Sequence, residues 1–295
     1  MIIDSQVHIW GADTPERPWP KRAPPQREIP LGHEELLGEM NAAGVDGVIL
    51  VPPSWEGDRN DLALHAAGLH PERFGIMGRL DPDAPDARDR LARWLEQPGM
   101  LGLRFIFSSA MMWGPLLDGR MDWVWSAAER ARVPVMMLVP HALMDRIDAI
   151  AERHPALQLV MDHMGLTGHA KDTEAFADFD KLLPLARRPN IAVKASALPC
   201  FVSDPYPFRS AHVYVRRVYD AFGPKRVYWG TDFSRLPCTY SQGITMFTEE
   251  MPWLPAEDLD WIMGRGISEA LGWPVADAGK TCGDALLQTE KVETL

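Results

Sequence analysis

RVYWGTD, at residues 226–232, is an apolar run that ends in a single carboxylate, Asp232. Residues 1–8 read MIIDSQVH and form a similar run, which ends in a histidine, His8. Continuous apolar runs of this length are typical of strands that are buried on both faces of a sheet. In a closed parallel barrel the first and last strands are neighbours. We therefore expect His8 and Asp232 to meet at one mouth of such a barrel, as parts of an enzyme's active site.

Six more runs of this kind lie between these two, and each is followed by an amphipathic or Ala/Leu-rich segment. The predicted strands are Ile2–His8, Gly47–Pro52, Phe74–Leu80, Leu101–Ile106, Val133–Val139, Leu157–Asp162, Ile191–Ser196 and Arg226–Thr231. Helical spacing from Leu36 to Ala43 stops at Gly44, and a last helix is predicted over Asp258–Leu271 with Gly272 as its cap. Strand–helix alternation repeated eight times predicts an α/β fold, a single-domain (β/α)₈ TIM barrel.

Two segments fall outside this repeat. Gly11–Leu31 is rich in proline and charge, and we expect it to form a loop over the mouth. The barrel is predicted to occupy residues 1–273, and residues 274–295 are predicted to form a C-terminal surface tail. An open doubly wound sheet is the alternative. Neither G-x-G-x-x-G nor a P-loop follows the first strand, which argues against that fold.

The composition limits the classes of function. The net charge of −11 argues against nucleic acid or an anionic membrane as a partner, although a few arginines at one mouth can still attract an anionic small molecule. No apolar stretch approaches the roughly 20 residues of a membrane helix, and no secretory signal is recognisable, so we expect a cytoplasmic protein. Three cysteines, Cys200, Cys238 and Cys282, suit a reducing compartment and are interpreted as unreactive thiols rather than metal ligands.

Polar side chains stand at the ends of most predicted strands, where the active site of a barrel lies. They are Gln6, His8, Ser54, Arg79, Arg104, His141, His163, Lys194, Ser196 and Asp232. Each has a structural interpretation beside the functional one. Asp232 could cap a helix, Arg104 could pair with a buried carboxylate instead of a substrate, and Lys194 with Ser196 could bind neighbouring carboxylates. Arg235 follows the last strand and could line the pocket.

At these residues the chain resembles a known group. DSQVHIW at residues 4–10, DHMG at 162–165 and WGTD at 229–232 resemble motifs of the amidohydrolase superfamily. Within it, the chain is most similar to the amidohydrolase 2 branch, which includes 2-pyrone-4,6-dicarboxylate lactonases and sugar lactonases. The resemblance runs from residue 1 to about residue 273. It implies a distorted (β/α)₈ barrel with its site at the strand ends.

One departure from the superfamily concerns metal. The first strand of its members usually ends His-x-His and supplies two ligands, whereas here the pattern is Gln6-x-His8. A neutral amide is a poor zinc ligand. The resemblance to a branch with metal-free members, together with the lost histidine, predicts no cofactor. If a single divalent ion such as zinc binds, the expected ligands are His8, His141, His163 and Asp232.

The resulting hypothesis is hydrolysis of a lactone or similar cyclic ester that carries a carboxylate. Asp232 is expected to act as general base on water, and His8 and His163, with help from Gln6, are expected to stabilise the oxyanion. The expected substrate-binding residues are Gln6, Arg79, Arg104, His141, Lys194 and Arg235, with the two arginines Arg79 and Arg104 holding the substrate carboxylate.

Two other hypotheses stay open. One is a metal-dependent decarboxylase or hydratase of the same superfamily that acts on an aromatic-derived acid. The other is a binding or regulatory protein that has kept the barrel and lost catalysis. In every case the expected partner is a small anionic molecule, and the sequence leaves a homo-oligomer open.

Overall fold

A nearly closed barrel of eight parallel strands forms the centre of the computed structural model, which describes residues 1–20, 24–108 and 110–274. Each strand pairs with the next along the chain, in the order β1 to β8. The strands are β1 Ile3–Val7, β2 Gly47–Leu50, β3 Phe74–Gly78, β4 Met100–Ile106, β5 Val135–Leu138, β6 Leu159–Met161, β7 Ile191–Ser196 and β8 Val227–Gly230. The bounds differ from the predicted ones by at most two residues, and the predicted (β/α)₈ barrel is confirmed.

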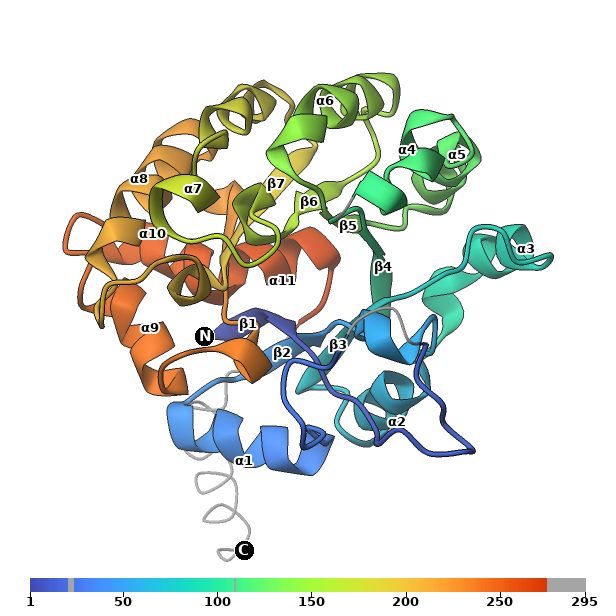
Figure 1. The fold of residues 1–295 in the computed structure, drawn as a ribbon, viewed down its shortest axis with the longest axis horizontal. Helices are drawn as coiled ribbons and strands as arrows, with labels where there is room; N and C mark the ends of the chain where they lie inside the picture. The colour runs from blue at the N-terminus through green and yellow to red at the C-terminus, as the bar shows by residue number, and fades with distance from the viewer. Residues whose placement is uncertain (21–23, 109, 275–295) are drawn as a thin grey trace, which may run out of the picture.

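Helices surround the strands, as Figure 1 shows. They are α1 His33–Ala43, α2 Asp61–Leu69, α3 Ala87–Ala92, α4 Gly114–Leu117, α5 Asp122–Ala131, α6 Met144–Arg153, α7 Asp172–Ala175, α8 Arg209–Phe222, α9 Tyr240–Thr248, α10 Ala256–Asp260 and α11 Gly266–Leu271. Gly44 ends α1 in the left-handed conformation, with a φ of 73°, as its position in the sequence predicts. The predicted C-terminal tail lies outside the described residues from residue 275 onward.

The predicted last helix is divided into three parts. A π-helical turn, Trp261–Arg265, separates α10 from α11. At Gly264 in this turn an added Cβ would lie 2.8 Å from the carbonyl oxygen of Met1, so the turn packs its backbone directly against the start of the chain. Gly272 then caps α11 with a φ of 61°, as predicted.

The core has two layers, which follow from strands that are apolar on both faces. The outer layer packs the strands against the helices. The inner layer fills the barrel with side chains such as Ile49, Met77, Met136 and Val160, and also contains Ile267 and Trp273. Since Trp273 donates a hydrogen bond to the carbonyl of Pro71, just before β3, the end of the chain described here plugs the N-terminal end of the barrel and leaves the opposite end for a site.

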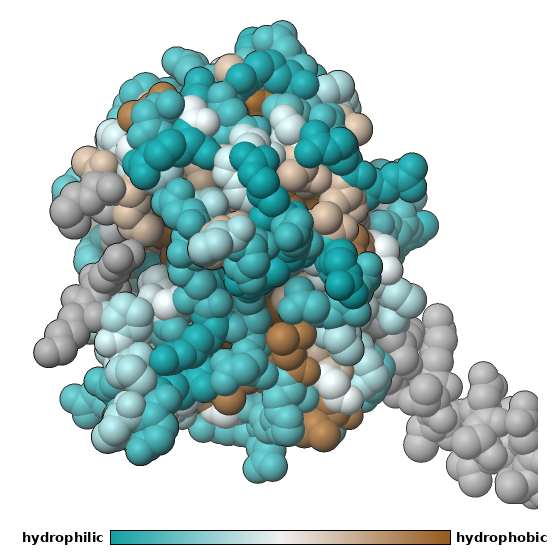
Figure 2. All heavy atoms as spheres, turned by 90° about the vertical axis from the view of Figure 1, so that its right-hand side faces the viewer, coloured by the Kyte–Doolittle hydropathy of each residue, from teal (hydrophilic) through white to brown (hydrophobic). Residues whose placement is uncertain are grey.

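The surface fits an acidic protein in water. On the face in Figure 2 hydrophilic side chains predominate, and apolar ones form small groups. The large apolar residues that are exposed lie on separate segments of the chain: Ile29, Leu69, Leu95, Leu117 and Val213. None of the helices in the described part of the chain has the length and apolarity needed to cross a membrane.

The strands β1 and β8 lie side by side, as the sequence predicts for a closed barrel. The backbone N–H of Asp232 donates to the carbonyl of Gln6 over 2.9 Å, and the N–H of Thr231 donates to the Asp4 carboxylate over 2.9 Å. The seam is tight, because a Cβ added at Gly230 would lie 2.6 Å from the Ser5 hydroxyl. Contacts between residues more than two hundred positions apart therefore join the first strand of the barrel to the last.

Candidate active site

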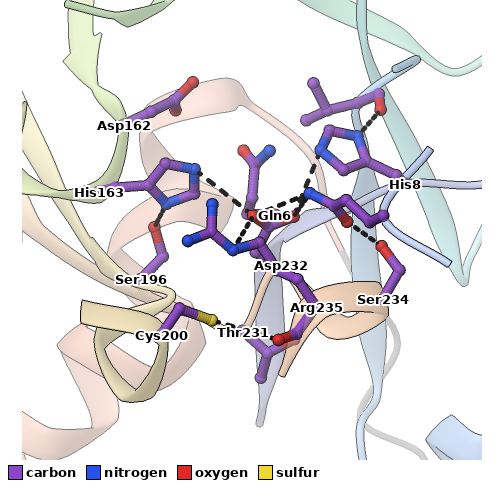
Figure 3. A network of polar contacts seen from close by, with 12 residues as sticks. Gln6, His8, Asp162, His163, Ser196, Cys200, Thr231, Asp232, Ser234 and Arg235 are labelled. Carbon is purple, nitrogen blue, oxygen red and sulfur yellow. Dashed lines mark hydrogen bonds and ion pairs between the residues drawn. The ribbon is translucent and has the colours of Figure 1, made fainter. Parts of the chain in front are cut away.

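Three side chains from distant strands meet at the C-terminal end of the barrel. His8 follows β1, His163 follows β6 and Asp232 follows β8. The Nε2 atom of His8 lies 3.3 Å from Oδ1 of Asp232, and Nε2 of His163 lies 3.8 Å from Oδ2 of the same carboxylate (Figure 3). The residues are only 5 %, 3 % and 2 % exposed, respectively. The structure thus places His8 and Asp232 together, as expected from the order of the strands.

The side chains of His163 and Asp232 are oriented by an unfavourable, left-handed backbone conformation. His163 and Asp232 have φ values of 53° and 54°, in the left-handed region that residues with a side chain rarely adopt. This conformation costs roughly 1–2 kcal/mol for each residue. Such residues cluster at functional sites, where the surrounding structure holds them in place.

Asp4 holds the Asp232 turn from the neighbouring strand. Its carboxylate accepts hydrogen bonds from the backbone N–H groups of Gln6 and Thr231 and from the hydroxyls of Thr231 and Tyr240. Burial raises the pKa of Asp4 to about 6, although these hydrogen bonds oppose the rise. Asp4 is not among the site residues predicted from the sequence. The available signal was an acid inside an apolar run, which needs partners when it is buried.

The tautomer of His8 follows from the contact of Nδ1, the ring nitrogen that faces away from Asp232. Nδ1 contacts the carbonyl oxygen of Val51. Because a carbonyl only accepts, Nδ1 carries the proton in the neutral ring and Nε2 turns a lone pair toward Asp232. Burial lowers the pKa of His8 below 6.5, which favours this neutral form. The expectation that His8 donates to an oxyanion is therefore corrected: its free nitrogen is an acceptor.

His163 can present the opposite polarity. Its Nδ1 lies 2.8 Å from the hydroxyl of Ser196 on β7, and its Nε2 faces Asp232. Burial lowers the pKa of His163 to about 4, so the ring is neutral at neutral pH. A hydroxyl can donate to Nδ1, in which case the proton of the ring stands on Nε2 as a donor toward the centre of the site.

Asp232 is ionised although it is buried. Burial alone raises the pKa of a carboxyl group, but positive charge on His8 and His163 when they are protonated, the charge of Arg235 and a hydrogen bond from Gln26 lower the pKa of Asp232 below its ordinary value. When both imidazoles are neutral, Arg235 and Gln26 are the groups that keep this effect. The Nε atom of Arg235 lies 3.7 Å from Oδ2. The site therefore presents a negative oxygen surrounded by nitrogens.

A buried ionic network lies beside this centre. Asp162, at the end of β6, accepts from Nε of Arg104 on β4 over 3.1 Å and lies 2.9 Å from Nζ of Lys194 on β7. Nζ of Lys194 also donates to Oε1 of Gln6 over 2.9 Å. Burial opposes the ionisation of Asp162, but Lys194 and Arg104 lower its pKa. The sequence left open whether Arg104 binds a carboxylate of the protein or one of the substrate. In the structure its Nε binds the protein carboxylate of Asp162.

Arg79, after β3, has spare hydrogen-bonding capacity. Its Nε lies 3.4 Å from Asp58, yet among the described residues its buried Nε and Nη1 have no hydrogen-bond partner. Burial and the nearby charge of Arg104 lower the pKa of Arg79 to about 10. Arg79 therefore has donors available for an anion, and the positive charge of Arg104 lies nearby.

A comparison with protein families identifies the barrel. The family model described as Amidohydrolase, Amidohydro_2, matches residues 3–272. The chain belongs to the amidohydrolase 2 family.

Known relatives of this amidohydrolase are distant. It is 26 % identical over 243 residues to the L-fucono-1,5-lactonase of Burkholderia ambifaria, a match that covers 78 % of this chain and 79 % of the lactonase. An amidohydrolase from Burkholderia multivorans with bound zinc has a similar fold, with a TM-score of 0.79, 21 % identity and coverage of 93 % of this chain and 100 % of that one. A probable 2-pyrone-4,6-dicarboxylic acid hydrolase from Acinetobacter baumannii with citric acid bound has a TM-score of 0.75, 16 % identity and coverage of 92 % and 99 %.

His141 of the amidohydrolase does not join the centre. Its Nε2 donates to the carbonyl of Met164 over 2.8 Å, and its ring packs against Phe179. It lines a separate cavity of about 230 Å³ together with Trp113 and Asp178. His8, His141, His163 and Asp232 were the ligands expected if a metal ion binds, and in this structure the β5 loop holds His141 against the backbone that follows His163 instead of beside the other three.

The remaining donors do not fit a metal ion. Among residues 1–20, 24–108 and 110–274, no group of three or more His, Cys, Asp or Glu side chains has the arrangement to hold one. Gln6 stands where the superfamily has a histidine, and its oxygen already accepts from the Lys194 ammonium, whose charge repels a second cation. Burial raises the pKa of Cys200 and that of Cys238, the latter to about 11, so both stay thiols. Cys282 lies outside the described residues.

Proposed function

We propose that this amidohydrolase is a lactonase that hydrolyses a carboxylate-bearing lactone with a water activated by Asp232. The observation that carries the proposal is the position of the Asp232 carboxylate, within 3.3 Å of Nε2 of His8 and 3.8 Å of Nε2 of His163 at the barrel mouth. The similarity to an L-fucono-1,5-lactonase and to a probable 2-pyrone-4,6-dicarboxylic acid hydrolase supports the same reaction class.

The water needs two acceptors, and the site offers two. Asp232 takes one proton of the water, and the lone pair on Nε2 of His8 accepts a hydrogen bond from the other, which orients the oxygen for attack. A carboxylate with a lowered pKa is a weak base. It therefore suits an activated lactone carbonyl, where proton transfer is completed as the bond to carbon forms, better than it suits an amide.

Two donors are available for the carbonyl oxygen as it becomes negative. One is Nε2–H of His163, when Ser196 donates to its Nδ1. The other is the amide nitrogen of Gln6, which is buried and has no hydrogen-bond partner among the described residues, and which lies between His163 and His8 in Figure 3. Each such donor contributes roughly 3–4 kcal/mol to stabilising the transition state. After the ring opens, the proton on Asp232 passes to the leaving hydroxyl oxygen.

The carboxylate of the substrate is assigned to Arg79 and Arg104. The unpartnered nitrogens of Arg79 would gain charge-assisted hydrogen bonds from it, and Arg104 adds a second positive charge nearby. The citric acid bound to the Acinetobacter relative is also a carboxylate ligand, which supports this chemical class.

The alternative, a metal-dependent decarboxylase or hydratase, is less well supported. It needs a divalent cation close to Gln6, where the ammonium group of Lys194 lies 2.9 Å from the amide oxygen. The binding-protein alternative does not explain why three ionisable side chains from three strands are held around one point, two of them by a strained backbone.

The test is the substitution Asp232→Asn, assayed on L-fucono-1,5-lactone and 2-pyrone-4,6-dicarboxylate. Asparagine keeps the size and tolerates the left-handed φ of 54°, so the melting temperature should change little. Loss of the base should lower kcat by about 10²–10⁴-fold. The matched control Asp260→Asn, at the other end of the barrel, should leave kcat unchanged. Full activity in Asp232→Asn would remove Asp232 from its role.

A further inference from the structure

Gln26 reaches the general base from the loop that follows β1. Its Nε2 lies 3.3 Å from both oxygens of Asp232, and its Oε1 accepts a hydrogen bond from the hydroxyl of Ser234. Two hundred and six positions separate Gln26 from Asp232. Its amide therefore lies against the face of the carboxylate that the attacking water needs.

The loop that carries Gln26 is fixed at both of its ends. On one side Arg17 makes hydrogen bonds to Glu56 and Asp61. On the other side the N–H of Trp10 donates to the carbonyl of Leu31 over 3.1 Å. Between these anchors, the described residues 24–31 bring Gln26 to the site, where its two contacts with Asp232 are long and easily exchanged.

The catalytic centre is closed in this arrangement. Its three residues are at most 5 % exposed, and the Gln26 amide covers both oxygens of the Asp232 carboxylate. The amide also has the polarity of the reacting groups. Its N–H bonds point at Asp232 as those of the water would, and its carbonyl accepts from Ser234 as an oxygen of the substrate would.

We propose, on the basis of the proposed lactonase function, that Gln26 is a specificity-determining residue that substrate must displace. Its amide occupies the position of the water and of a substrate oxygen, and it leaves this position when substrate binds, while Leu31 keeps its hydrogen bond with Trp10. Only a ligand that replaces both hydrogen bonds, one donated to Asp232 and one accepted from Ser234, competes well. Displacement leaves the hydroxyl of Ser234 free to donate to another oxygen of the substrate.

Competition between the Gln26 amide and the substrate should change the measured KM. The apparent affinity for substrate is reduced by the fraction of molecules in which the amide is out of the site, and removing the amide restores that factor. For one exchangeable amide–carboxylate contact we expect Gln26→Ala to raise kcat/KM by about three- to tenfold through a lower KM. The melting temperature should stay the same, because Gln26 is a loop residue that is only partly buried.

The experiment compares Gln26→Ala with Glu28→Ala, a control at an exposed position of the same segment. Kinetics are measured on L-fucono-1,5-lactone and 2-pyrone-4,6-dicarboxylate, and amide hydrogen exchange is measured at the residues of this segment that have a backbone N–H, Gln26–Ile29 and Leu31. We expect lower KM and faster exchange in Gln26→Ala, and wild-type values in Glu28→Ala. A kcat/KM that is unchanged or lower in Gln26→Ala would overturn the proposal.

The exchange measurement separates this proposal from the lactonase assignment. If the wild-type protein hydrolyses neither lactone, the proposed function fails, yet faster exchange in Gln26→Ala would still show that the amide holds residues 24–31 over Asp232. Equal exchange in the wild type and in Gln26→Ala would refute the contact whether or not the protein is a lactonase.

Discussion

The carbonyl oxygen of Val51 determines which ring nitrogen of His8 carries the proton. Because the carbonyl of Val51 accepts from Nδ1, the nitrogen that faces Asp232 is an acceptor, and the ring helps to hold a water instead of an oxyanion. His163 has a hydroxyl partner, Ser196, which leaves its polarity free. Two histidines in similar surroundings thus receive different roles from their outer hydrogen bonds.

This difference predicts the pH dependence of the rate. Burial lowers the pKa of His8, so the neutral ring persists below pH 6.5, and the activity that depends on it is present above this lowered pKa and is lost as the pH falls through it. His163 has a pKa of about 4, and the pKa of Asp232 lies below its ordinary value. We therefore expect kcat/KM to be constant from pH 8 to about 6.5 and to fall between about 6.5 and 4. An acid limb that begins above pH 7 would contradict the assigned state of His8.

At the scale of elements, the seam between β1 and β8 builds the site. Gly230 allows the two strands to approach, Asp4 on β1 binds Thr231, and the backbone of Gln6 binds Asp232. The unfavourable φ of Asp232 is therefore held by contacts across the seam rather than by its own loop. The same contacts therefore close the barrel and orient Asp232, the proposed general base.

Alanine substitutions at Gly230 and Gly68 compare a glycine in the β1–β8 seam with a glycine that has open space around it. In Gly230→Ala the new methyl group would meet Ser5 at 2.6 Å and Asp4 at 3.1 Å, so we expect a loss of about 1–3 kcal/mol in the free energy of unfolding, together with a lower kcat. Gly68, in α2, has open space around it, and Gly68→Ala should stabilise the protein by roughly 0.5–1 kcal/mol at unchanged kcat. Urea denaturation and kinetics of both variants measure this, and equal effects would argue against a tight seam.

At the scale of the whole molecule, the distribution of charge matters more than its sum. The chain carries a net charge of −11, yet Arg79, Arg104 and Lys194 converge on the barrel interior with Asp162 between the last two. Under the proposed function, this positive charge would attract an anionic substrate and oppose the binding of a divalent cation.

Removal of metal therefore should not affect turnover. After dialysis against EDTA, we expect kcat on an activated lactone to stay within about twofold of its starting value, because no step assigned here uses an ion that a chelator could withdraw. The measurement is a steady-state assay beside elemental analysis of the same sample. Activity lost to EDTA and restored by zinc would instead favour the metal-dependent alternative.

The local pattern of apolar residues was sufficient to predict the barrel fold. Most strands are runs of β-branched and aliphatic residues, and burial on both faces can be recognised from such runs without knowledge of their partners, although β1 reads IDSQV. The order of the strands then makes β1 and β8 neighbours, which is why the meeting of His8 and Asp232 could be predicted. The resemblance of three short motifs to the amidohydrolase superfamily led to the same barrel and to the family.

The partners of individual polar side chains were decided only by the tertiary structure. Arg104 pairs with Asp162, His141 turns to the backbone of Met164, and Gln26 comes from a loop with no recognisable motif to contact the general base. A hydrogen bond or ion pair depends on positions to within a fraction of an ångström, set by packing across the whole barrel. Apolar periodicity is instead a property of neighbouring residues, so the chain alone determines its strands while the folded barrel determines its chemistry.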